Sequence, residues 1–335
     1  MKTGLKVKHV AFAILLALFL TACGGGGGGG GGESPSGISY TGLTIEATID
    51  ENNAVVLATG AYQGGQTGSA LVGSVGAIQV GEDGSVGLPR TLKVSQVLEG
   101  ALHKVDMTSR SVGTFVGAIY TEKDTIYGDY GGSASYTINV DDQTGVFSGS
   151  ITFNSYSDDG VTIISGPVSF SGSLDVNTED LVEFSFSFDN LTGVSGSDSF
   201  TLDGDISFDN TVYPAEITMT MFLKDNNTGK VYKLEDYVMT LTDTGSYVDV
   251  EGSGTYFDPD YGYVSISTVT PFRIYYGDIY PSDGVLVIHG NTGIAGGSTM
   301  ARLAALSSST CQVEADTNGD GIYDWNSGDM NWDDL

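Results

Sequence analysis

A short loop near the C-terminus carries a regular set of oxygen-bearing side chains, at Asp316, Asn318, Asp320 and Asp324. Calcium prefers several oxygen ligands, and acidic side chains spaced along a tight loop supply them. We expect these four residues to form a calcium site that stiffens the C-terminal segment. The Asn-Gly and Asp-Gly steps in the loop also form tight turns without a metal, so a solvated hairpin turn is the alternative.

The segment that begins at Asp316 resembles the start of the calcium loops of EF-hand, dockerin and thrombospondin type 3 proteins. The resemblance implies a ligand order along the loop. It assigns loop positions one, three, five, six and nine to Asp316, Asn318, Asp320, Gly321 and Asp324. Ser327 stands where an EF-hand has its bidentate glutamate, so the match stops before the end of the loop.

Six tyrosines form a second group of candidate binding residues, interleaved with acidic residues such as Asp258 and Asp278. They are Tyr256, Tyr261, Tyr263, Tyr275, Tyr276 and Tyr280. Aromatic faces can stack on sugar rings while carboxylates accept hydrogen bonds from hydroxyl groups, so the group predicts a carbohydrate ligand. Tyrosine is also common in strands, which makes ordinary β structure the alternative.

Catalytic motifs of the familiar kinds do not occur. The sequence has no Gly-x-Ser-x-Gly, Ser-x-x-Lys or His-Glu-x-x-His, and His103 and His289 are the only histidines after residue 22. Paired carboxylates can hydrolyse glycosides, but 42 acidic residues form such pairs by chance. We therefore expect a non-enzymatic binding or structural protein. A polysaccharide hydrolase and a carrier of an apolar ligand are the alternatives.

The N-terminus has the pattern of an export signal. Lys2, Lys6 and Lys8 precede the apolar run 10–20. A membrane-spanning helix needs about 20 apolar residues, so this run is too short to span a membrane. A basic start, a short apolar core and small residues after it are typical of a signal peptide. We assign residues 1–22 to this signal.

The residues Leu20-Thr21-Ala22-Cys23 resemble the lipobox of bacterial lipoproteins. The resemblance implies cleavage before Cys23, a diacylglycerol on its sulfur and a fatty acid such as palmitate on its amine. It thus predicts a protein anchored by lipid in the bacterial cell envelope. Gly24 follows Cys23 where inner-membrane lipoproteins often have Asp, which favours the outer membrane; the side of that membrane stays open.

Charge and cysteine content agree with export. The formal net charge is −29, and the signal removes three of thirteen basic residues and no acidic one. So acidic a chain repels nucleic acid and anionic headgroups, and we expect no nucleic-acid partner. A carbohydrate or an envelope protein is the expected partner. Because Cys23 is assigned to lipid, Cys311 has no partner for a disulfide, and we expect a buried, inert thiol.

Two segments separate the anchor from the main domain. Residues 23–37 contain nine consecutive glycines and predict a flexible tether. Residues 38–111 predict two short helices, at about 49–62 and 91–106, joined by a Gly-rich stretch. Thr48 and Glu51 have the spacing of a capping box for the first helix.

Residues 112–335 predict an antiparallel β domain that includes the Asp-rich loop. The apolar residues Val182, Phe184, Phe186 and Phe188 alternate with polar ones, as in a strand with one buried face. Similar runs occur at 133–140, 146–154, 161–175, 198–208, 213–224, 230–242, 247–257, 261–276, 284–289, 299–306 and 311–315. Short links join antiparallel neighbours, so we expect a mainly β fold: a meander arranged as a sandwich, a β-roll or a partly closed barrel.

Overall fold

The computed structural model describes residues 37–73, 119–141, 144–174 and 181–335. Strands dominate, and the expected mainly β fold is confirmed. The strands are β1 (Ile119–Tyr127), β2 (Gly131–Asp141), β3 (Val146–Ser157), β4 (Thr162–Leu174), β5 (Leu181–Ser195), β6 (Asp198–Asp209), β7 (Ala215–Asp225), β8 (Val231–Asp243), β9 (Tyr247–Asp258), β10 (Gly262–Tyr275), β11 (Asp283–Thr292), β12 (Ser298–Ser307), β13 (Thr310–Asp316) and β14 (Trp325–Asn331).

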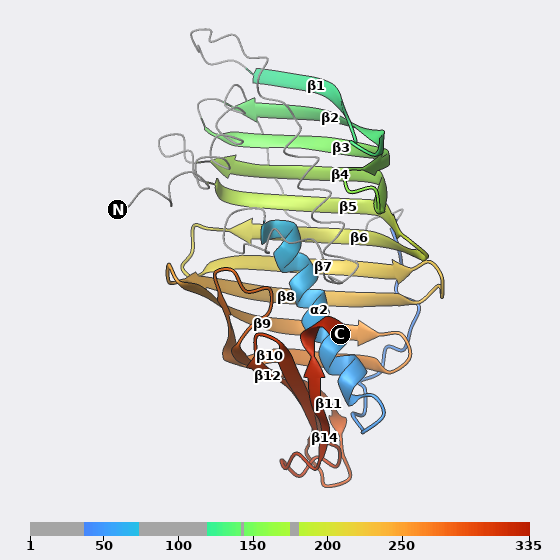
Figure 1. Ribbon diagram of the computed structural model, residues 1–335, viewed down its shortest axis with the longest axis vertical. Coiled ribbons are helices and arrows are strands. Elements are labelled where there is room, and N and C mark those ends of the chain that lie inside the picture. The colour runs from blue at the N-terminus through green and yellow to red at the C-terminus, as the bar shows by residue number, and fades with distance from the viewer. Residues whose placement is uncertain (1–36, 74–118, 142–143, 175–180) are drawn as a thin grey trace.

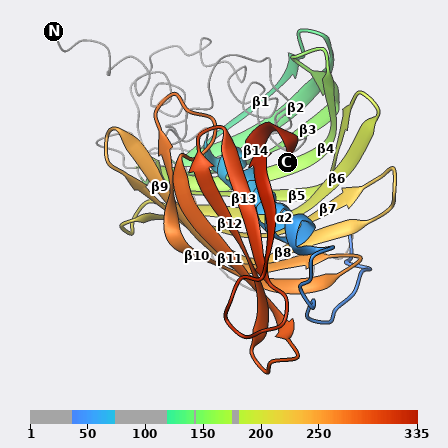
Figure 2. The same ribbon diagram turned by 60° about the horizontal axis from the view of Figure 1, so that its bottom comes forward.

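The fourteen strands form one sheet in which every strand pairs with its sequence neighbour. All of these pairings are antiparallel. β1 and β14 stand at the two ends of the strand order, so the sheet is open. The predicted meander is confirmed, and it takes the form of one sheet that is not closed into a barrel. β1 to β9 form a broad surface, and β10 to β14 curl forward beside the helix (Figures 1 and 2).

The alternation seen in the sequence gives the sheet two different faces. On β5, Phe186 and Phe188 are each 2% exposed, while Ser187 between them is exposed. Ser187 pairs with Ser169 of β4, and Phe186 pairs with Phe170, so the alternation stays in phase across the strands. We call the face that carries the buried phenylalanines the inner face and the opposite one the outer face.

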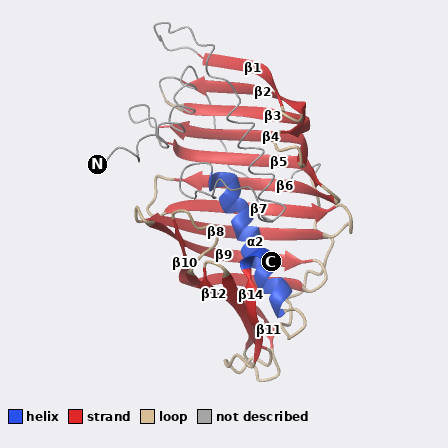
Figure 3. Cartoon of the chain, viewed as in Figure 1, coloured by secondary structure: helices blue, strands red, loops and turns tan. Residues whose placement is uncertain are grey.

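One helix precedes the strands in the described part of the chain, α2 (Ala54–Gly73). It lies diagonally across the inner face and contacts β6 to β9 and β11 to β13 (Figure 3). The second helix, predicted at 91–106, lies outside the described residues. The first helix is confirmed, but it starts at Ala54 rather than near residue 49 and extends beyond residue 62.

The predicted capping box of Thr48 and Glu51 is wrong by two residues. Oδ1 of Asp50 accepts the N–H groups of Asn52 and Asn53, and Oδ1 of Asn53 accepts the N–H of Asp50. Asp and Asn side chains satisfy free N–H groups at a helix start as Ser and Thr do. Thr48 and Asp50 are both able to cap a helix and lie two positions apart, so the sequence spacing alone does not show which of them caps α2.

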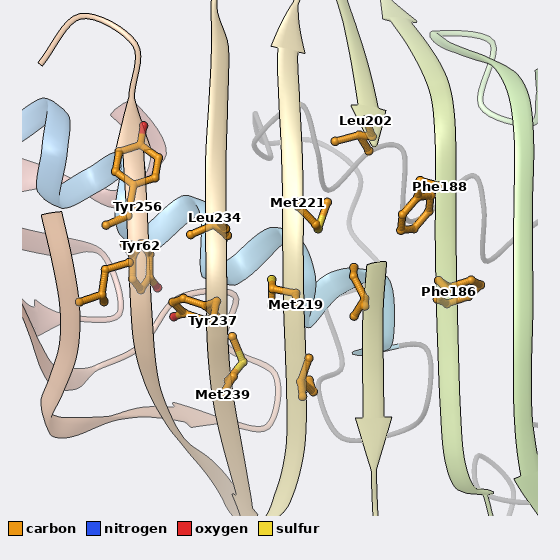
Figure 4. Close-up of a cluster of buried hydrophobic side chains, with 14 of the residues drawn as sticks. Tyr62, Phe186, Phe188, Leu202, Met219, Met221, Leu234, Tyr237, Met239 and Tyr256 are labelled. Carbon is orange, nitrogen blue, oxygen red and sulfur yellow. The ribbon is translucent and has the colours of Figure 1, made fainter. Parts of the chain in front are cut away.

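Glycines let the helix approach the sheet closely. A Cβ on Gly60 would lie 2.4 Å from Oη of Tyr256, and one on Gly65 would lie 2.4 Å from Oη of Tyr237. Both tyrosines point from the sheet toward the helix, beside Leu234 and Met239 (Figure 4). Glycine lowers helix propensity by about 1 kcal/mol relative to alanine, and here the loss is offset by burial of whole aromatic rings.

The C-terminal turn η1 (Trp332–Asp334) adds a buried tryptophan to the core beside α2. Trp332 is 2% exposed, and its ring centroid lies 5.1 Å from that of Tyr62 on α2 and 5.8 Å from that of Tyr280. Its Nε1–H donates to the carbonyl of Ser307 at 3.0 Å. Tyr62 also contacts Phe272 of β10, so the helix, β10 and the C-terminus share one aromatic cluster.

Residues 37–46 cross the outer face of the sheet, opposite the helix, and we call this segment the strap. At its start the N–H of Ile38 bonds to the carboxylate of Asp203 in the middle of β6. At its end Glu46 forms a parallel bridge with Tyr263 of β10. The chain therefore runs from the outer face, around the sheet, to the helix on the inner face.

Candidate ligand-binding site

The six candidate tyrosines do not form one surface. Tyr256 and Tyr280 are 6% and 8% exposed, and both pack in the core near α2. Tyr261 and Tyr263 lie at the β9–β10 hairpin, whereas Tyr275 ends β10 and Tyr276 follows it. Tyr263 and Tyr275 are separated by twelve residues of one strand, which corresponds to roughly 40 Å. Tyr275 and Tyr276 are exposed, at 45% and 47%. They do not share a face: Tyr275 pairs with Tyr247, whereas Tyr276 bonds to Asp243, which pairs with the buried Val248.

Tyr275 belongs to a cluster at the outer face that the sequence did not predict. It pairs with Tyr247 of β9, and their ring centroids lie 5.5 Å apart in a T-shaped contact. The guanidinium carbon of Arg273 lies 4.0 Å from the centroid of the Tyr247 ring. We call Tyr247, Arg273 and Tyr275 the tyrosine–arginine cluster.

A carboxylate fixes the cluster in place. Nε and Nη2 of Arg273 donate to the two carboxylate oxygens of Asp249, each at 2.9 Å. This bidentate pair raises the pKa of Arg273, so the guanidinium stays charged. The pair therefore holds Arg273 against the Tyr247 ring at neutral pH. Outside the cluster, Oη of Tyr276 donates to Asp243, and burial together with this carboxylate raises the pKa of Tyr276 to about 12.

The exposed groups of the cluster suit a polar ligand that has a flat face. The ring of Tyr275 is available for stacking, and Arg273 and Asp249 keep further hydrogen-bonding capacity at their exposed edges. The sequence analysis missed Tyr247, Arg273 and Asp249 because their proximity depends on the pairing register. A search for aromatic and charged residues at matching distances from the hairpin would have found them.

The acidic loop holds itself together with hydrogen bonds. Asp316 is fully buried; its Oδ1 accepts N–H groups from Asn318, Gly319 and Asp320, and its Oδ2 accepts the N–H of Gly321 at 2.7 Å. Four N–H donors compensate the buried charge. The structure therefore assigns Asp316 the role of organising the turn, whatever else the loop binds.

The other three loop residues differ in how they use their oxygens. Asp324 accepts hydrogen bonds from the backbone and side chain of Thr317, which lower its pKa. Asp320 accepts the N–H of Ile322 at 2.8 Å. Oδ1 of Asn318 is buried and has no hydrogen-bond partner. Within the described residues no group of three or more His, Cys, Asp or Glu side chains is arranged to hold a metal. Calcium binding stays a prediction.

The loop is joined to the neighbouring β11–β12 turn. The N–H of Ala295 donates to the carbonyl of Asn318 at 2.8 Å, and the N–H of Gly297 donates to the carbonyl of Gly319 at 3.1 Å. A Cβ on Gly319 would lie 2.2 Å from the carbonyl oxygen of Gly297. The two loops form one compact tip at the end of the curled strands.

Other chemically active groups have structural partners. Burial raises the pKa of Asp203 and of Asp258; the first bonds the strap, and the second accepts N–H groups of Asp260 and Tyr261. Burial raises the pKa of the Cys311 thiol to about 11, and this cysteine is fully buried as expected. His289 lies on β11, and His103 lies outside the described residues.

A cavity of about 50 Å³ lies between α2 and β8 to β10 and is lined by Tyr62, Gln66, Tyr237 and Phe272. Sites for small organic ligands measure roughly 300–1,000 Å³. This cavity has room for a few water molecules, so it does not support a carrier of an apolar ligand.

No helix in the described part of the chain is both long and apolar enough to cross a membrane. Cys23 and the tether lie outside the described residues. The chain matches no protein family, no curated protein and no solved structure. Its function must therefore be argued from its own residues.

Proposed function

We propose that this chain is a lipid-anchored, non-enzymatic protein of the bacterial cell envelope that binds a carbohydrate through the tyrosine–arginine cluster. The observation that carries the proposal is the cluster itself. The exposed ring of Tyr275 and the half-buried ring of Tyr247 stand beside a charged Arg273–Asp249 pair on the sheet. Aromatic stacking needs a flat apolar ring face, and the charged pair supplies donors and acceptors for hydroxyl groups.

Anchoring rests on the sequence of the signal and of Cys23. Radiolabelled palmitate should enter the wild type and Cys311→Ala, but not Cys23→Ala, when the full chain is expressed in a bacterium that processes lipoproteins. The Cys311 variant is the matched control because it removes the other cysteine. Equal labelling of Cys23→Ala would contradict the anchor.

Binding can be tested on an oligosaccharide array with the purified chain. We expect Tyr275→Ala to lose binding, because it removes the exposed ring of the cluster. Tyr127→Ala is the control, since Tyr127 is 73% exposed on β1, far along the sheet from the cluster. Binding that survives Tyr275→Ala, or is lost equally in the control, would contradict the assignment.

A second candidate property is calcium binding at the acidic loop. It is supported by the buried, unpaired Oδ1 of Asn318, since buried polar atoms without partners are rare and costly. Calcium should raise the melting temperature of the wild type above its value in EDTA. Asn318→Ala should abolish the rise, and magnesium at equal ionic strength should not reproduce it. An unchanged melting temperature in the wild type would assign the loop to turn formation alone.

A further inference from the structure

One part of this acidic chain carries almost no charge. The sequences of β3 and β4 contain no Asp, Glu, Lys or Arg, and β2 contains only Asp141 at its end. Asp141 is 7% exposed. Apart from the buried Asp141, the outer face of these three neighbouring strands therefore has no charged side chain, although the chain has a formal net charge of −29.

Hydroxyl groups cover this uncharged surface in rows. The strand register places Thr137, Ser150 and Ser169 directly opposite one another on β2, β3 and β4. A parallel row of polar residues lies two positions along the strands, formed by Asn139, Ser148 and Ser171. We call these six residues the hydroxyl face. Four of them are exposed: Ser148, Ser150, Ser169 and Ser171.

The strap lies on the same side of the sheet as the hydroxyl face. Ser169 pairs with Ser187 on β5, and Ser187 pairs with Asp205 on β6. Asp203 is two residues before Asp205 on the same strand and so points to the same side. The N–H of Ile38 bonds to Asp203, and Gly37 contacts its carboxylate.

The described part of the chain therefore begins, at Gly37, over the middle of the outer face. Asp203 is the sixth residue of the twelve-residue strand β6. Either end of that strand is roughly 20 Å away, and β1 is roughly 25 Å away across five strand spacings. The fourteen residues 23–36, which begin with the anchored Cys23, connect this point to the membrane.

The length of this connection favours an orientation in which the outer face is turned to the membrane. A glycine-rich chain of fourteen residues has an r.m.s. end-to-end distance of roughly 20 Å. To turn the inner face to the membrane, it would have to run roughly 20 Å to the rim and about 10 Å more past the thickness of the sheet. Turning the outer face to the membrane requires neither of these extra lengths of chain.

We propose that the hydroxyl face lies against the headgroup layer of the membrane in which Cys23 is anchored. The proposal rests on the anchoring of Cys23. Because the hydroxyl face has no carboxylates, it approaches anionic headgroups without the repulsion that the rest of the chain would meet. Its Ser and Thr hydroxyls donate hydrogen bonds to the phosphate and sugar oxygens of headgroups. Lys123, which pairs with Thr137 at the β1 edge, adds a positive charge.

Fluorescence quenching tests this orientation with the lipidated full chain. Ser150→Cys and Ser169→Cys report the hydroxyl face, and Val56→Cys reports the helix side, where Val56 is 45% exposed. Each variant is labelled with a thiol-reactive dye; Cys311 does not interfere because it is buried. The proteins are reconstituted into vesicles of phosphatidylethanolamine and phosphatidylglycerol that carry a headgroup quencher.

We expect several-fold stronger quenching at Ser150→Cys and Ser169→Cys than at Val56→Cys. Equal quenching, or stronger quenching at Val56→Cys, would overturn the orientation while leaving the anchor intact. Protein that does not float with the vesicles would show instead that the anchor is missing, and the proposal would fail with it. Dye self-quenching without labelled lipid would assign the face to a second copy of the chain and overturn the proposal.

A charge variant separates surface contact from simple proximity. Ser150→Glu with Ser169→Cys as the reporter places a carboxylate within the hydroxyl face. We expect quenching at Ser169→Cys to fall in vesicles that contain phosphatidylglycerol, while the fraction of protein on the vesicles stays unchanged. Val56→Glu with the same reporter is the matched control and should change nothing. Equal quenching with and without Ser150→Glu would contradict contact with the headgroups.

Discussion

The ring of Tyr40 meets the ring of Phe257 edge-on, with their centroids 5.4 Å apart. Oη of Tyr40 also donates to the carbonyls of Leu43 and Asp258, at 3.0 and 2.9 Å. This side chain therefore ties the strap to β9 and closes a turn within the strap. The contact joins residues that are more than 200 positions apart in the sequence.

Tyr40→Phe tests this tie. The ring contact remains and the two hydrogen bonds are lost, so we expect the free energy of unfolding to fall by about 1 kcal/mol at neutral pH. Tyr127→Phe, at an exposed position of β1, is the control and should leave it unchanged. A loss in the control as large as that in Tyr40→Phe would contradict a specific role for the strap.

Alkaline pH should remove the advantage that Tyr40 gives. Burial, with Asp258 and Asp260 nearby, raises the pKa of Tyr40 from 10.0 to about 12 in the folded chain. The folded state thus holds its proton more tightly than the unfolded state does, so the stability from this group is complete below pH 10 and is lost as the pH rises through 12. Urea unfolding across this range should show the difference between wild type and Tyr40→Phe shrinking. A constant difference would contradict the raised pKa.

Gly65→Ala tests the close contact between α2 and the sheet. The new Cβ would lie 2.4 Å from Oη of Tyr237, and overpacking of this kind costs about 1–3 kcal/mol, partly offset by the higher helix propensity of alanine. Adding Tyr237→Phe removes the closest clashing atom and leaves the ring carbon Cζ 2.9 Å from the new Cβ. In chemical denaturation, we therefore expect Gly65→Ala to cost less stability in the Tyr237→Phe background than in the wild type. An equal cost in both backgrounds would place the cost of Gly65→Ala elsewhere.

Asp316→Ala should destabilise the chain in the presence of EDTA. The substitution leaves four buried or partly buried N–H groups without their acceptor, so we expect a loss of more than about 2 kcal/mol. Asp320→Ala removes an exposed side chain that accepts one N–H from Ile322, and should cost less than about 1 kcal/mol. Equal losses would show that the buried hydrogen bonds of Asp316 are not the main stabilising contribution.

Cys311 should be unreactive in the native protein. It is fully buried, and its pKa is raised to about 11 by that burial, so almost no thiolate is present near neutral pH. A colorimetric thiol reagent should react only as denaturant unfolds the chain. Ser150→Cys supplies an exposed thiol as the positive control. Native Cys311 reacting as fast as that thiol would mean that the core opens readily near β13.

Strand alternation predicted β2 to β13, because each of these strands has one buried and one exposed face. The apolar alternation predicted only the first part of β5. The strand continues to Ser195, beyond a bulge at Asn190. Asn190 has a φ of 54°, and the bulge shifts the alternation, so the second half of the strand did not match the first. β1 and β14 were missed as separate strands because edge strands carry few alternating apolar residues.

The candidate sites were harder to predict than the strands. Arg273 and Asp249 are 24 residues apart, and only the register of β9 with β10 brings them into contact. Alternation decides which face a residue occupies but not its partner across the ladder. Without this information the sequence analysis placed Tyr256 and Tyr275 in one candidate group. In the structure Tyr256 lies against α2, whereas Tyr275 lies on the outer face. The acidic loop was easier to locate, because its spacing is local.

The meander also sets the order in which the chain can fold. Each strand pairs only with its sequence neighbour, so hairpins can form one after another along the chain. The helix cannot follow this order. α2 ends at Gly73, yet it packs against strands as late as β13, and Trp332 covers Tyr62. α2 must therefore wait for almost the last residue of the chain before its side of the core is complete.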